Sequence, residues 1–139
     1  MIPAAVIHDY AMEQTNRLLT TLASQIRRAA KRPGPDEIHD LRVSIRRFTE
    51  GLRLFAEFFP KSQAKKIRVM LRRMLRLTSD LRNRDIALEF LGKSPAAEHR
   101  KRLKKERADY QRRFSEMVRH WSARDFSAQW RNGLALGLA

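Results

Sequence analysis

The stretch that decides the fold is residues 35–59, PDEIHDLRVSIRRFTEGLRLFAEFF. Its large apolar residues recur at three- and four-residue steps, which is the spacing of one face of an α-helix. At about 100° per residue, the apolar side consists of Leu41, Ile45, Phe48, Leu52 and Phe55. The other side is led by one histidine and three arginines: His39, Arg42, Arg46 and Arg53. The stretch therefore predicts an amphipathic helix with a basic face.

The ends of this helix are marked by proline and glycine. Residues 33–35, Pro-Gly-Pro, break the chain before it, and Pro60 breaks the chain after it. Pro35 suits the first helical position, because its missing N–H has no partner there in any case. Asp36 and Glu37 suit the positive end of the helix dipole. We expect the helix to run from about 35 to 59.

The helical period continues in both directions along the chain. Further helices are predicted over about 3–31, 62–91, 95–122 and 124–136, with Ser62 as an N-cap. No run of alternating β-branched residues is long enough to predict a strand. The sequence thus predicts an all-α fold: an antiparallel bundle of four long helices plus a short C-terminal helix, as a single domain over residues 1–139.

The helix predicted over 62–91 repeats the two-sided design. Its basic row consists of Lys65, Arg68, Arg72 and Arg76, and its apolar arc of Ile67, Met70, Leu71, Met74, Leu77 and Leu81. An ordinary solvated face is the simplest explanation of one such row, but solvated faces usually mix both signs of charge. Neighbouring antiparallel helices could bring both basic rows onto one wall. Such a wall repels itself unless an anion neutralises it, as a chain of phosphates would.

The overall charge agrees with a polyanionic partner. Thirty Lys and Arg stand against fifteen Asp and Glu, which gives a net charge of +15 at pH 7. Nucleic acid, an acidic membrane surface and polyphosphate are the candidates. The absence of cysteine excludes disulfides, thiolate metal sites and cysteine nucleophiles. No segment has the roughly 18 consecutive apolar residues of a membrane span.

Two further charged groups have structural explanations. Arg82 and Asp85 lie on the apolar arc of their helix, and their i,i+3 spacing predicts a mutual ion pair that fixes the helix end. The cations of a third basic cluster point all round the helix predicted over 95–122, which fits a generic solubilising segment as well as a site. That cluster consists of Arg100, Lys101, Arg102, Lys104, Lys105 and Arg107.

Residues 38–47, IHDLRVSIRR, resemble the opening signature of the CHAD domain, a helical family named for its histidine. That signature is His-Asp-Leu-Arg-Val, two further residues, then Arg-Arg. Residues 81–86, LRNRDI, resemble the family's Arg-Asp-x-Asp-Val segment, with Asn83 where an Asp is usual. Residues 122–126, SARDF, loosely resemble its small-residue turn before a later helix. The resemblance covers about residues 35–134.

The resemblance implies an all-helical fold that binds inorganic polyphosphate through basic residues lining a central channel, with no catalysis and no cofactor. Residue by residue, the first motif assigns binding to His39, Arg42, Arg46 and Arg47. Position and face extend the assignment to Lys65, Arg72 and Arg76. With Arg53 and Arg68 from the two basic rows, these residues form the predicted polyphosphate site. A cytoplasmic location follows as an expectation, with polyphosphate granules as a place of action.

A usual CHAD domain contains two similar helical halves around the channel, and this chain resembles the first half. We therefore expect a C2 homodimer that completes the channel. The apolar tail is expected to supply part of the contact, through Trp130, Leu134, Leu136 and Leu138. The alternative is that the chain is a fragment of a longer gene product.

Two other functions remain open. Non-specific nucleic-acid binding is favoured by the net charge alone, although no helix-turn-helix pattern and no exposed row of aromatic residues is present. Histidine phosphotransfer is suggested by His39 with Arg42 one helical turn away. A metal site is not expected, because the neighbours His39 and Asp40 diverge by about 100° on a helix. We see no hydrolytic constellation either.

Overall fold

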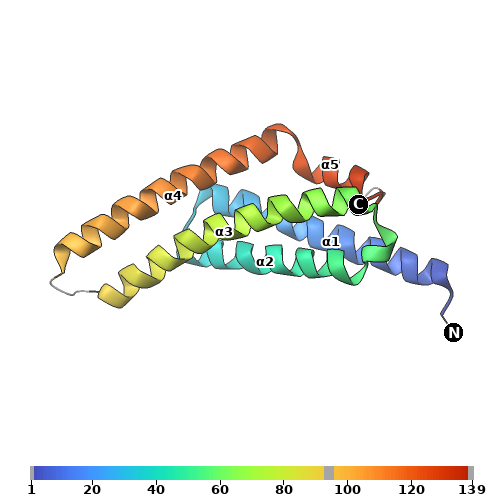
Figure 1. The fold of residues 1–139 in the computed structure, drawn as a ribbon, viewed down its shortest axis with the longest axis horizontal. Coiled ribbons are helices and arrows are strands. Elements are labelled where there is room, and N and C mark those ends of the chain that lie inside the picture. Colours follow the sequence, from blue (N-terminus) through green and yellow to red (C-terminus); the bar gives the residue numbers. More distant parts are fainter. Residues whose placement is uncertain (1, 93–95, 138–139) are drawn as a thin grey trace.

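A computed structural model describes residues 2–92 and 96–137 of the chain (Figure 1). These residues form five α-helices and one short 3-10 turn, and the described ranges contain no strand. The elements are α1 (Ala4–Lys31), α2 (Pro35–Leu54), η1 (Ala56–Phe58), α3 (Lys61–Leu91), α4 (Ala97–Ala123) and α5 (Phe126–Gly133). The prediction of an all-α fold is confirmed.

The four long helices are arranged as two antiparallel hairpins (Figure 1). One hairpin is α1 packed on α2, the other is α3 packed on α4, and the contact of α2 with α3 joins them. The short α5 turns back and contacts α1, α3 and α4. This is the predicted bundle with a short C-terminal helix, and it places α2 and α3, which carry the basic rows, side by side.

Several boundaries differ from the predicted ones. The helix α2 ends at Leu54 rather than at Phe59, because Phe55 leaves the helical dihedrals (φ −105°, ψ 24°) and the chain turns through η1. That turn buries Phe59 in the core. The prediction of Ser62 as an N-cap is wrong, because α3 already begins at Lys61, with Pro60 in the cap position.

The turn between α4 and α5 falls in the segment predicted to hold it, residues 122–126. Asp125 adopts the left-handed conformation there (φ 48°, ψ 61°), which aspartate tolerates better than most residues. As a result, α5 begins at Phe126 rather than at Arg124, and it ends at Gly133. The predicted start of the fourth helix, Pro95, lies outside the described residues, and α4 begins at Ala97.

One contiguous apolar core receives residues from all five helices. Leu41, Ile45, Phe48 and Leu52 of α2 are buried as predicted, whereas Phe55 is only half-buried. The ring of Phe48 stacks on that of Trp130 of α5, with 6.0 Å between centroids and 4° between planes. Trp121 of α4 meets Trp130 edge-on at 5.4 Å. These rings attach α5 to α2 and α4.

The C-terminal tail contradicts one expectation. Trp130, Leu134 and Leu136 are at most 5% exposed within the single chain. They are part of its core, so the proposal that they supply a contact between two chains is wrong for these three residues. Leu138 lies outside the described residues.

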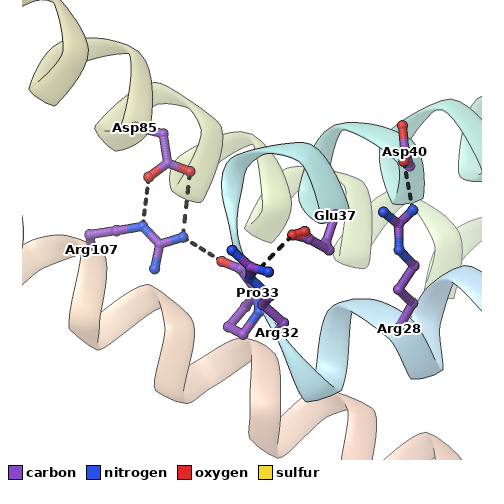
Figure 2. A network of polar contacts seen from close by, with 7 residues as sticks. All are labelled: Arg28, Arg32, Pro33, Glu37, Asp40, Asp85 and Arg107. Atoms are coloured by element: carbon purple, nitrogen blue, oxygen red, sulfur yellow. Dashed lines mark hydrogen bonds and ion pairs between the residues drawn. The ribbon is translucent and has the colours of Figure 1, made fainter.

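The ion pair predicted between Arg82 and Asp85 is also wrong. Asp85 instead accepts a hydrogen bond of 2.6 Å from Nε of Arg107 in α4 (Figure 2). No ion pair among the described residues joins Arg82 to Asp85. The i,i+3 spacing permitted that pair, but α3 packs on α4 and brings a better-placed guanidinium to the carboxylate.

Arg107 also reaches the first hairpin. Its Nη2 donates to the carbonyl oxygen of Pro33, in the turn between α1 and α2 (Figure 2). Its Nη1 donates to Oε1 of Gln111. We call Arg107, Asp85 and the Pro33 carbonyl the clasp, because together they tie α4 to α3 and both to the α1–α2 turn. The side chains of Asp85 and Arg107 are only 10% and 17% exposed.

We expect Arg107→Gln to lower the free energy of unfolding by about 3 kcal/mol, because it leaves the Asp85 carboxylate enclosed and unpaired. The matched control is Arg112→Gln, which removes the same charge from the same helix. Arg112 pairs with Asp109 on the surface, so its loss should cost less than about 1 kcal/mol. Urea denaturation followed by circular dichroism measures both, and equal losses would contradict a role for the clasp.

Candidate functional site

Arginines from α2 and α3 converge on the side where these two helices meet. Arg53 of α2 lines a small cavity of about 120 Å³ together with Arg68 and Arg72 of α3. The rest of the cavity wall consists of less polar side chains, those of Ile45, Thr49, Leu71 and Leu75. Members of both predicted basic rows therefore share one surface.

Arg42 lies deeper on the same side and connects the two helices. Its Nη1 donates to the carbonyl oxygen of Leu75 at 2.8 Å and to Oγ1 of Thr78 at 3.3 Å, both on α3. Thr78 is fully buried and donates in turn to the Met74 carbonyl. No carboxylate of the described residues pairs with Arg42, so its charge is held in place without an acidic partner.

The pKa of Arg42 is lowered from its usual value, first because the group is partly buried and then because Arg46 and Arg82 are close by. Each of these causes disfavours the charged form of the guanidinium. An anion bound beside Arg42 would reverse the effect of the neighbouring charges. Three guanidinium groups thus converge here, and we define the α2–α3 basic face as Arg42, Arg46, Arg53, Arg68, Arg72 and Arg82.

Arg82 is the member of this face that the sequence reasoning misassigned. It follows Leu75 by seven residues, or two helical turns, so it lies on nearly the same side of α3 as the carbonyl that Arg42 contacts. It is half-buried and forms no ion pair with any described residue. The seven-residue spacing from Leu75 was the signal that could have placed it on the basic face.

The other predicted site residues lie on or beside this face in different ways. His39 precedes Arg46 by seven residues, which places it on the same side of α2, and it is exposed. Lys65 of α3 is exposed, and Arg76 of α3 is exposed beside a cavity that it lines together with Arg113 of α4. No hydrogen bond or ion pair among the described residues joins any of these three to the convergent arginines.

Arg47 lies elsewhere. It follows Asp40 by seven residues and so shares the side of α2 that carries that carboxylate. Asp40 accepts a hydrogen bond of 2.7 Å from Arg28 of α1 (Figure 2). The structure therefore places Arg47 toward α1 and away from the α2–α3 basic face, although the sequence motif groups it with Arg46.

The third basic cluster divides between structural and exposed residues. Arg107 belongs to the clasp, and Nη1 of Arg100 donates to the Gly92 carbonyl at 2.9 Å. The remaining cations are exposed on α4: Lys101, Arg102, Lys104 and Lys105. Part of this cluster therefore stabilises the α3–α4 hairpin.

Searches for two other kinds of site give negative results within the part of the chain that the structure describes. No group of three or more His, Asp or Glu side chains gathers there in a way that could hold a metal ion. No helix in residues 2–92 and 96–137 is long and apolar enough to cross a membrane.

Comparison with known proteins gives one match. A family model described as the CHAD domain matches residues 11–138, which is nearly the whole chain and includes all three motifs noted in the sequence. No curated protein and no solved structure matches the chain.

Proposed function

Because the chain belongs to the CHAD domain family, we propose that it binds inorganic polyphosphate on the α2–α3 basic face and catalyses no reaction. The family is associated with polyphosphate binding. The observation that carries the proposal for this chain is the partly buried Arg42, which has no carboxylate partner among the described residues and has Arg46 and Arg82 close by. Burial first, and then these two neighbouring charges, lower the pKa of Arg42. Arg53 pairs with Glu50 at 3.1 Å, but no ion pair among the described residues neutralises the other arginines of the face, and a polyanion would supply that negative charge.

Binding would be electrostatic and geometric. The planar guanidinium of arginine presents forked donors that match two phosphate oxygens. Cations one turn apart on a helix lie about 5–6 Å from each other, so a linear phosphate polymer can contact several of them in series. Arg42 is already fixed by its bonds to α3, and a fixed donor loses little side-chain entropy on binding. Affinity should fall steeply with salt, as it does for other phosphate backbones.

Non-specific nucleic-acid binding is the second candidate, and the net charge of +15 is the observation that favours it. The described aromatic side chains do not form an exposed row on which bases could stack, because Phe48, Trp121 and Trp130 are packed in the core and the exposed Tyr10 and Phe90 lie on different helices. Histidine phosphotransfer at His39 has no further support. The cytoplasmic location and the association with granules stay predictions.

We also propose that two chains pair so that both basic faces enclose one phosphate polymer. The support is that the face is built from one side only, by α2 and α3. Exposed apolar side chains offer contact surface elsewhere, at Val6, Tyr10 and Leu54 at one end of the bundle and at Phe90 of α3. These replace the buried tail as candidates for the contact.

The first test reverses two charges on the basic face. Arg46→Glu with Arg72→Glu should weaken the binding of long-chain polyphosphate by about 100-fold or more, because each charged hydrogen bond contributes roughly tenfold or better. The matched control is Lys101→Glu with Lys104→Glu, which changes the net charge equally but on exposed residues of α4. We expect a loss of only a few-fold there.

Isothermal titration calorimetry at fixed salt measures both double variants. A circular dichroism spectrum of each confirms that the helices are intact before the affinities are compared. If both pairs weaken binding equally, the charge acts in bulk, and the proposal of a defined site fails.

The second test measures the oligomeric state. If two chains pair around one phosphate polymer, multi-angle light scattering should show a species of about twice the chain mass of 16.3 kDa, at least once polyphosphate is added. If the protein stays a monomer at high micromolar concentration, with and without polyphosphate, the dimer proposal is wrong. That result would not contradict the proposal that the face of a single chain binds polyphosphate.

A further inference from the structure

A second cationic groove lies on the other side of α3, where that helix packs on α4. Two adjoining cavities of about 480 and 280 Å³ make it up, and both are lined by Arg73, Arg113 and Met117. Positions 73, 77 and 80 of α3 face this groove, whereas positions 68, 71 and 75 face α2. Only Arg76 borders this groove and also belongs to the predicted polyphosphate row.

The charges in the larger cavity are unbalanced. It is lined by three arginines and a histidine, but by one acid, Glu116. No ion pair with a carboxylate of the described residues is formed by any of the three arginines, Arg73, Arg113 and Arg124. Asp80, the acid of the smaller cavity, lies 3.8 Å from Arg84 and is engaged there. The groove therefore favours an anion.

One of these arginines is held in position by an aromatic ring. The guanidinium of Arg113 lies 5.3 Å from the ring centroid of Tyr110, one turn before it on α4. The guanidinium of Arg84 lies over the same ring at 4.7 Å. This cation–π contact fixes Arg113 without neutralising it, so its donors stay available to a phosphate.

The groove differs from the α2–α3 basic face because large apolar side chains line it beside the charged ones. Met70 of α3 and Met117 of α4 are half-buried, and they line the larger cavity together with Trp121. Thioethers make favourable contacts with flat aromatic groups. A bare phosphate chain would gain nothing from these side chains, whereas a phosphorylated molecule with an apolar ring would.

We propose that this groove binds a nucleoside polyphosphate. Its phosphates would lie against Arg73, Arg113 and Arg124, and its base against Met70 and Met117. Glu116 would accept a hydrogen bond from a ribose hydroxyl or a base amine, donors that polyphosphate lacks. The larger cavity, of about 480 Å³, lies in the range of roughly 300–1,000 Å³ that is usual for small-ligand sites. The site is separate from the proposed polyphosphate site.

The test compares three probes by isothermal titration calorimetry at about 0.15 M salt: ATP, tripolyphosphate and adenosine. Tripolyphosphate carries the phosphates without the nucleoside, and adenosine carries the reverse. We expect one ATP per chain to bind at least tenfold more tightly than tripolyphosphate, because the apolar floor contributes only to ATP. Adenosine alone should bind more weakly than both.

Neighbouring arginines of α4 provide matched variants. Arg113→Gln should weaken ATP binding by about tenfold or more, since it removes a charged donor. Arg112→Gln removes the same charge next to it, but Arg112 pairs with Asp109 on the surface, and ATP affinity should change less than twofold. Met117→Gln should weaken ATP binding but leave tripolyphosphate binding unchanged. Arg72→Gln, on the α2–α3 basic face, should weaken only the binding of long-chain polyphosphate.

Three results would overturn the proposal. Equal affinities for ATP and tripolyphosphate would mean that the groove only extends the polyanion surface. Equal effects of Arg113→Gln and Arg112→Gln would mean that ATP binds through net charge. If ATP does not bind, but an acidic amphipathic peptide binds and Arg113→Gln abolishes that binding, the groove is a site for a protein partner instead.

Discussion

The packing of α2 on α3 brings like charges together, and the cationic surface proposed to bind polyphosphate depends on that constraint. Leu41 and Ile45 of α2 pack into one core with Leu71 and Leu81 of α3, and all four are almost fully buried. This packing fixes which sides of the two helices meet, and Arg42 then crosses to the Leu75 carbonyl. Burial of the Arg42 guanidinium lowers its pKa, and the nearby charges of Arg46 and Arg82 lower it further. The apolar core thus holds together arginines that would otherwise repel each other apart. A bound polyanion would relieve this repulsion.

The remaining helices hold α2 and α3 in this relation. The clasp of Arg107 on Asp85 and on the Pro33 carbonyl ties both hairpins together at the α1–α2 turn (Figure 2). At a separate place in the core, the stacked rings of Phe48 and Trp130 attach α5 to α2. Two of the cationic residues counted by composition alone, Arg100 and Arg107, have structural contacts. Net charge is therefore a poor guide to which cations are available for a ligand.

Periodicity predicted the helices and most of the basic face, because a helical face depends only on spacing within one segment. Arg42, Arg46, Arg53, Arg68 and Arg72 were placed correctly on that basis. What failed depended on contacts between segments. Asp85 pairs with a residue 22 positions away, which no local spacing could predict, and so Arg82 was misassigned. The tail was expected at a surface, but Leu134 and Leu136 fold back into the core. The α3–α4 groove was missed because its lining comes from two helices whose relative rotation only the structure gives.

The central claim is that the α2–α3 basic face is an ordered site and not a diffuse charge. The most direct measurement is a competition titration at about 0.15 M salt, with long-chain polyphosphate against duplex DNA matched in total phosphate. An ordered site, with Arg42 held by its hydrogen bonds to α3 and further arginines along the same face, predicts that polyphosphate outcompetes DNA by orders of magnitude. Equal competition would contradict the account and leave a helical protein that binds polyanions through its net charge.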